Sequence, residues 1–199
     1  MNEPHSPPRA GLPGALDRVR AADHLAVERL AGLDQAGRLR VWMLGATRSA
    51  DGWALFVLVP VALIGWGSRG FAGVSVGILS GVTVGLIVQS LKALFRRSRP
   101  LGLDIEDPIG APDKHAFPSG HSAHAFGAVV LAWWISPWLG LALLPVAAAV
   151  GVSRMFFGLH YPSDVIVGGV LGCLITFGVI AGASASGLVD WLLRISPIG

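Results

Sequence analysis

Long stretches without charged residues divide most of the chain into segments that suit a lipid environment. A helix needs roughly 20 apolar residues to cross a hydrocarbon core about 30 Å thick. Four charge-free stretches reach or approach this length: 70–91, 119–136, 138–153 and 165–189. A fifth, 52–68, is marginal because Pro60 interrupts it, although membrane helices tolerate such a proline when neighbouring groups bind the freed carbonyl. The pattern predicts an all-α, polytopic transmembrane helical bundle of about five spans.

The N-terminal quarter follows another pattern. Residues 1–14 are rich in proline, which predicts a tail without stable structure. From residue 15 to about 47, apolar side chains recur at helical spacing with charged side chains on the other faces. This region is too charged to span a bilayer, and we expect it to lie at the membrane interface, the alternative being a helix packed on its own protein. The predicted organisation is a tail at 1–14, an amphipathic interfacial helical region at 15–49 and a transmembrane domain at 50–199.

Composition supports the membrane assignment. Of the 199 residues, 53% are hydrophobic and 14% are charged, and the mean hydropathy is +0.64. A soluble domain carries about 25% charged residues, so a soluble globular class is excluded. The single cysteine, Cys173, lies in an apolar segment and cannot form an intrachain disulfide.

Polar residues of catalytic type gather at the ends of the predicted spans. Lys92 follows the second span, Ser119 to His121 open the third, Arg154 ends the fourth and Asp164 opens the fifth. If five spans alternate in direction, all these ends fall on the same side of the membrane. Charge at this depth is costly and is kept mainly for function, so the sequence predicts one site built from three blocks.

The cations and the serine block suit a phosphate group. Lys92 would bind phosphate oxygens through its compact charge, and Arg99 through its forked guanidinium. Arg96 and Arg97 are better explained as a basic cluster that binds anionic lipid headgroups. The helix that starts at Ser119 would offer free N–H groups to an anion, and Gly120 would let it approach closely. An ordinary serine N-cap is the alternative for this block alone.

The third block supplies candidates for nucleophilic chemistry. His160 and Asp164 lie within about one helical turn. A carboxylate that accepts from one ring nitrogen leaves the other nitrogen free to attack. Taken alone, the pair also fits an interfacial histidine bonded to a capping aspartate.

Together the blocks resemble the three signature motifs of the type 2 phosphatidic acid phosphatase superfamily. The resembling residues are Lys92 with Arg99-Pro100, Pro118-Ser119-Gly120-His121, and Ser153-Arg154 with His160 and Asp164, in matching order and spacing. The resemblance covers about residues 52–182. It implies phosphate binding by Lys92, Arg99, Ser119, Gly120 and Arg154. It further implies that His121 is the general acid and that His160 is the nucleophile, assisted by Asp164. The implied mechanism runs through a phosphohistidine, without a metal or other cofactor.

The distribution of cations predicts the orientation. With five spans the N-terminal region and the site share a side, which carries most cations, while Arg69 and Arg194 lie on the other. The positive-inside rule then places the site on the cytoplasmic side of a bacterial inner membrane. Besides the lipid phosphate substrate, we expect anionic headgroups to contact the basic N-terminal region, and we expect no nucleic-acid partner.

The sequence leaves the substrate open among phosphatidic acid, phosphatidylglycerophosphate, prenyl diphosphates and polyprenyl-linked phosphates, including a polyprenylphosphoryl-ribose phosphate. The acidic residues of the 101–117 loop either contact headgroup hydroxyls or are simply solvated. Two other functional classes share features with this chain. A vanadate haloperoxidase shares the site chemistry but is soluble, and a non-enzymatic lipid-binding or flippase-like protein would not need both His121 and His160.

Overall fold

The computed structural model describes residues 14–33, 37–50, 55–100 and 115–197. These residues form seven helices and no strand. The helices are α1 (Ala15–Ala31), α2 (Arg38–Arg48), α3 (Leu55–Phe95), α4 (Gly120–Ile135), α5 (Pro137–Phe156), α6 (Pro162–Ala185) and α7 (Leu188–Ile195). The prediction of an all-α fold is confirmed for the described part of the chain.

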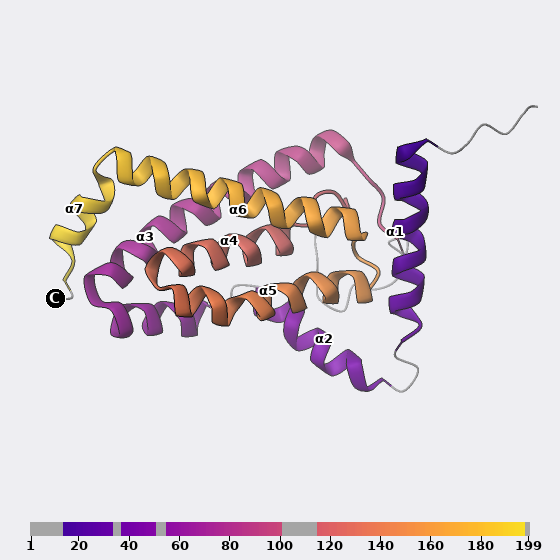
Figure 1. Cartoon of the computed structure of the whole chain (residues 1–199), viewed down its shortest axis with the longest axis horizontal. Coiled ribbons are helices and arrows are strands. Elements are labelled where there is room, and N and C mark those ends of the chain that lie inside the picture. Colours follow the sequence, from indigo (N-terminus) through magenta and orange to yellow (C-terminus); the bar gives the residue numbers. More distant parts are fainter. Residues whose placement is uncertain (1–13, 34–36, 51–54, 101–114, 198–199) are drawn as a thin grey trace, which may run out of the picture.

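Helices α3 to α6 pack side by side as a bundle, with α4 in contact with α3, α5 and α6 (Figure 1). Helix α1 lies across one end of this bundle, and α7 lies at the opposite end. Helix α2 packs on α5. The outer faces of the bundle carry exposed apolar side chains such as Ile78, Leu86 and Phe177. Exposed apolar side chains on long apolar helices are expected where lipid is the solvent.

Helix α3 consists of two arms. Gly67 has the positive φ of 51° with ψ of −128°, a conformation outside the helical region that glycine adopts readily. The chain reverses there, so the arm before Gly67 and the arm after it run in different directions (Figure 1). The arms correspond to the predicted stretches 52–68 and 70–91.

Within the described part of the chain, three helices are long and apolar enough to cross a membrane: Leu58–Phe95, Pro137–Phe156 and Pro162–Ala185. Helix α4 is apolar but has only 16 residues. The chain is therefore a polytopic membrane protein, while the number of five spans stays a prediction because it depends on counting both arms of α3 and the short α4.

The predicted N-terminal helical region is two helices rather than one. Helix α1 contacts the ends of α5 and α6, and its Asp23 and Val27 are buried. Leu16, Val19 and Trp42 remain largely exposed. The region thus packs on its own protein through one face and leaves apolar side chains exposed on another, while its location at the membrane interface stays a prediction. Residues 1–13 of the predicted proline-rich tail lie outside the described residues, and Gly14 is the N-cap of α1.

Candidate active site

The three sequence blocks meet at the end of the bundle that α1 crosses (Figure 1). Two hydrogen bonds connect segments far apart in sequence. The backbone N–H of Ser119 donates to the carbonyl of Asp164 over 3.0 Å, and Lys92 Nζ donates to the carbonyl of His115 over 2.9 Å. The side chains of Lys92, Ser119 and Asp164 are all buried. The ends of the predicted spans therefore lie close together in the structure, as the sequence predicts.

His160 lies at the centre of this cluster, in the connection between α5 and α6, and is only 1% exposed. Its Nδ1 lies 2.6 Å from the carbonyl oxygen of Ala116. A carbonyl oxygen only accepts, so Nδ1 carries the proton and the lone pair of the neutral ring is on Nε2.

Electrostatics keep this ring neutral. Burial lowers the pKa of His160 well below its usual value, and the positive charges of Arg154, Lys92 and Arg99 lower it further. The bond to Ala116 opposes these effects but does not outweigh them. A neutral imidazole with its lone pair on Nε2 is the form required of a nucleophile.

Asp164 occupies a different place from the one its spacing suggests. Its Oδ2 accepts the backbone N–H of Tyr161 over 2.8 Å and its Oδ1 accepts from Arg97 Nη1 over 2.6 Å. The distance from Oδ2 to His160 Nδ1 is 3.9 Å, beyond a hydrogen bond. Asp164 thus caps the first turn of α6, and the acceptor that fixes the His160 ring is the Ala116 carbonyl.

The three predicted phosphate-binding cations are close enough for their charges to act on His160. All three are buried, with Arg99 7%, Lys92 4% and Arg154 1% exposed. Arg154 Nη1 donates to the hydroxyl of Thr47 in α2 over 2.9 Å. Three positive charges around a neutral imidazole, in a water-poor site, form an environment that favours an anion.

The serine block opens α4 as predicted. Ser119 is the N-cap, and its hydroxyl accepts the backbone N–H of Ser122 over 3.4 Å and bonds the Ser122 hydroxyl over 2.9 Å. Gly120 and His121 follow in the first turn and are half-buried. The positive end of α4 therefore faces the same cluster as the cations.

Arg97 belongs to the site, although its place in the basic run predicts contact with lipid headgroups. Its guanidinium donates to Asp164, Ser163 and Asp23, over 2.6, 2.8 and 2.8 Å. It also lies 4.1 Å from the centre of the Tyr161 ring. Its pKa is raised, since burial alone would lower it but the hydrogen bond to Asp23 and both carboxylate charges act more strongly. The spacing of the basic run offers no signal that distinguishes Arg97 from Arg96.

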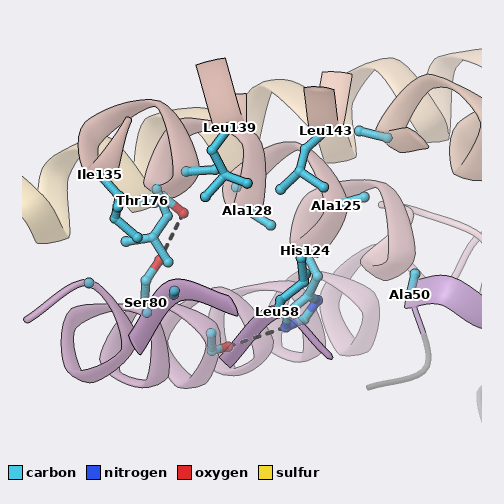
Figure 2. A pocket seen from close by; sticks show the side chains of 18 of the residues that line it. Ala50, Leu58, Ser80, His124, Ala125, Ala128, Ile135, Leu139, Leu143 and Thr176 are labelled. Carbon is cyan, nitrogen blue, oxygen red and sulfur yellow. Dashed lines mark hydrogen bonds between the residues drawn. The ribbon is translucent and has the colours of Figure 1, made fainter. Parts of the chain in front are cut away.

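An apolar cavity of about 900 Å³ lies mainly among α3, α4 and α5, and none of the candidate site residues described above lines it (Figure 2). His124 stands at its wall, where Nδ1 lies 2.9 Å from the carbonyl of Gly120 and Nε2 lies 3.2 Å from that of Gly81. At another wall, the hydroxyls of Ser80 and Thr176 share a 2.8 Å hydrogen bond. His124 thus bridges α4 and α3, in agreement with a packing role.

The acidic side chains at 104, 106, 107 and 113 fall in the 101–114 segment, which lies outside the described residues. The two readings of that loop both stay predictions.

Comparisons with known proteins indicate the family to which this chain belongs. The PAP2 superfamily matches residues 71–187. The decaprenylphosphoryl-5-phosphoribose phosphatase of Mycolicibacterium smegmatis is 31% identical over 159 residues, which are 80% of this chain and 74% of that protein. Phosphatidylglycerophosphatase B of Bacillus subtilis is 30% identical over 173 residues, 80% of this chain and 82% of that protein.

Solved structures show the same fold. The crystal structure of a transmembrane PAP2-type phosphatidylglycerolphosphate phosphatase from Bacillus subtilis matches with a TM-score of 0.68 at 25% identity, covering 85% of this chain and 88% of that one.

The matched residues include all three sequence blocks, and both relatives described above are named as phosphatases. The predicted family and enzyme class are confirmed. The chain belongs to the PAP2 superfamily, and it is an integral-membrane phosphatase of lipid phosphates.

Proposed function

We propose that the protein removes a terminal phosphate monoester from the polar headgroup of a membrane lipid, through a phosphohistidine formed on His160. The observation that carries the proposal is the buried, neutral His160 among Lys92, Arg99 and Arg154. Both relatives described above, each about 30% identical over 80% of this chain, are named for lipids with such a phosphate. A polyprenylphosphoryl-ribose phosphate and phosphatidylglycerophosphate are thus the first substrates to test.

The chemistry follows from the arrangement of these groups. The cations and the N-terminus of α4 hold the phosphate oxygens and offset the charge that builds up in the transition state. The lone pair of His160 Nε2 attacks phosphorus as the P–O bond to the headgroup breaks, and His121 donates a proton to the departing oxygen. Water then attacks the phosphohistidine, giving a proton back to His121 and releasing inorganic phosphate and the neutral ring.

The proposed orientation places the site on the cytoplasmic side of a bacterial inner membrane. Both N-terminal helices lie at the site end, since α1 crosses that end and α2 contacts Arg154 (Figure 1). Six of their arginines, at 18, 20, 29, 38, 40 and 48, are exposed and add positive charge that attracts anionic headgroups. Among the described residues, the cationic side chains at the far end of the bundle are Arg69 and Arg194. A reporter fused after Arg194 should read as periplasmic, and a cytoplasmic signal would refute this orientation.

The enzyme activity is tested by phosphate release from detergent-purified protein. The panel contains a polyprenylphosphoryl-ribose phosphate, phosphatidylglycerophosphate, phosphatidic acid and a prenyl diphosphate, each with the wild type and with His160→Ala. Release from the headgroup monoesters that is lost in His160→Ala is the expected result, because no other described group offers the same nucleophile. Release confined to the diphosphate would refute the monoester proposal, and turnover by His160→Ala would refute the nucleophile.

A further inference from the structure

The two N-terminal helices contribute buried polar side chains to the site, although they precede the residues matched by the family. In α1, Asp23 is 3% exposed, and in α2, Thr47 is fully buried. Burial of a charge or a hydroxyl costs free energy unless it is hydrogen-bonded. Both side chains find their partners among the residues of the site.

Asp23 binds the start of α6 and the guanidinium beside it. Its Oδ2 accepts from Arg97 Nη2 over 2.8 Å and from the Ser163 hydroxyl over 2.5 Å, and its Oδ1 accepts the Ser163 backbone N–H over 3.0 Å. Burial alone raises the pKa of Asp23, but the hydrogen bonds from Arg97 and Ser163 bring it below its usual value. The carboxylate is therefore ionised and fixed.

Arg97 connects the fixed Asp23 carboxylate to Asp164. Its Nη1 binds Asp164 Oδ1, while its Nη2 binds Asp23. Asp164 Oδ2 also accepts the backbone N–H of Tyr161, the residue next to His160. The position of Asp164 therefore fixes the turn that holds the imidazole. On the other side of that turn, His24 of α1 packs edge-on against the Tyr161 ring, with centroids 4.9 Å apart.

Thr47 acts on a different member of the site. Its hydroxyl accepts from Arg154 Nη1 over 2.9 Å, and both residues are almost entirely buried. A long, flexible side chain loses rotamer freedom when it is held in one geometry, and a fixed acceptor favours the bound geometry. Thr47 therefore aims the Arg154 guanidinium.

We propose that Asp23 and Thr47 are positioning residues for the phosphatase reaction, Asp23 acting through Arg97 on the Asp164–His160 turn and Thr47 acting on Arg154. The inference rests on the proposed function of those groups. It makes α1 and α2 parts of the active site, in addition to any contact they make with the membrane surface.

The test uses the full-length protein in detergent and a short-chain, water-soluble phosphate monoester, so that membrane attachment has no influence on the rate. Asp23→Asn removes the charge that holds Arg97, and the expected result is a loss in kcat on the order of tenfold with little change in KM. Glu28→Gln, an exposed carboxylate on the same helix, is the matched control and should retain wild-type activity.

The second arm addresses Arg154. Thr47→Val keeps the volume but removes the hydroxyl that accepts from Arg154 Nη1, so KM and the inhibition constant of orthovanadate should rise on the order of tenfold. Thr47→Ser restores the hydroxyl and should recover most of this loss, which a purely structural role would not require. Thr83→Val is the control, because the Thr83 hydroxyl bonds only the carbonyl of Leu79 in its own helix.

The outcomes separate two failures. If Asp23→Asn and Thr47→Val match their controls while wild type is active and His160→Ala is not, the positioning role is wrong and the helices serve only attachment.

If wild type releases no phosphate, calorimetric titration with orthovanadate tests the positioning role instead. Binding weakened by Thr47→Val supports the positioning role with another substrate, and unchanged binding overturns it. Should Asp23→Asn fail to fold, Arg97→Lys, which keeps one charge but loses the fork, must show the same kcat loss.

Discussion

Helix α6 approaches the start of α4 so closely at Gly168 that a single methyl group there should disturb the site. A Cβ on Gly168 would overlap the carbonyl oxygen of Ser119 and would lie 3.2 Å from both the carbonyl carbon and the nitrogen of that residue. All three are backbone atoms, which cannot rotate away. Gly168→Ala therefore forces α6 and the N-terminus of α4 apart.

The size of the effect follows from the displacement. A carbon and a carbonyl oxygen need about 3.3 Å, so relief of the overlap takes a movement on the order of 1 Å. The movement falls one turn from Asp164, whose carbonyl accepts the Ser119 N–H over 3.0 Å. Misplacement of reacting groups by about 1 Å costs on the order of 100-fold in rate. We expect kcat to fall by about that factor.

The assay is phosphate release in detergent by Gly168→Ala, with Gly178→Ala as the matched control. Gly178 lies on the same helix, and a Cβ there would meet nothing within 4 Å. The control should keep wild-type kcat, since the only expected change is the higher helix propensity of alanine compared with glycine. Wild-type kcat in a folded Gly168→Ala protein would refute the argument that the α4–α6 contact sets the site.

Three further predictions concern pH, metals and the bundle core. Because His160 has a lowered pKa in the fold and an ordinary one of 6.5 when unfolded, the unfolded state binds more protons between those values. Stability should therefore fall as pH drops below 6.5, and thermal melts of His160→Gln should lack this decline. Orthovanadate should inhibit phosphate release and EDTA should leave it unchanged, while strict dependence on an added metal would contradict the histidine mechanism. Thr176→Val removes the 2.8 Å bond to Ser80 and should lower unfolding stability by about 0.6 kcal/mol without changing kcat, measured by denaturation in mixed detergents; a change in kcat would mean that this core contact reaches the site.

Local patterns carried much of the architecture. The charge-free stretches after residue 70 predicted α4, α5, α6 and the second arm of α3, because a helix in lipid needs an apolar surface along its whole length. The positions of Lys92, Ser119 and Asp164 at the ends of the predicted spans then indicated that the three blocks meet. That inference worked because helix ends alternate between the two sides of a membrane.

Contacts between distant segments were beyond such patterns. The acceptor of His160 Nδ1 is a backbone carbonyl 44 residues away, not the carboxylate one turn on. Any residue has a carbonyl, so no sequence signal marks Ala116. The same holds for Arg97, whose neighbours in the basic run look alike until folding brings Asp23 next to it.

The sequence by itself thus determined most of the segments that are helical, those that suit a membrane and the side chains that are candidates for the chemistry, since these follow from local periodicity and residue type. Only the tertiary structure decided how those side chains are held, as in the bond from Arg154 to Thr47 across 107 residues. Hydrogen-bond partners depend on distances of a few tenths of an ångström between helices, and those distances are set by packing of the whole bundle.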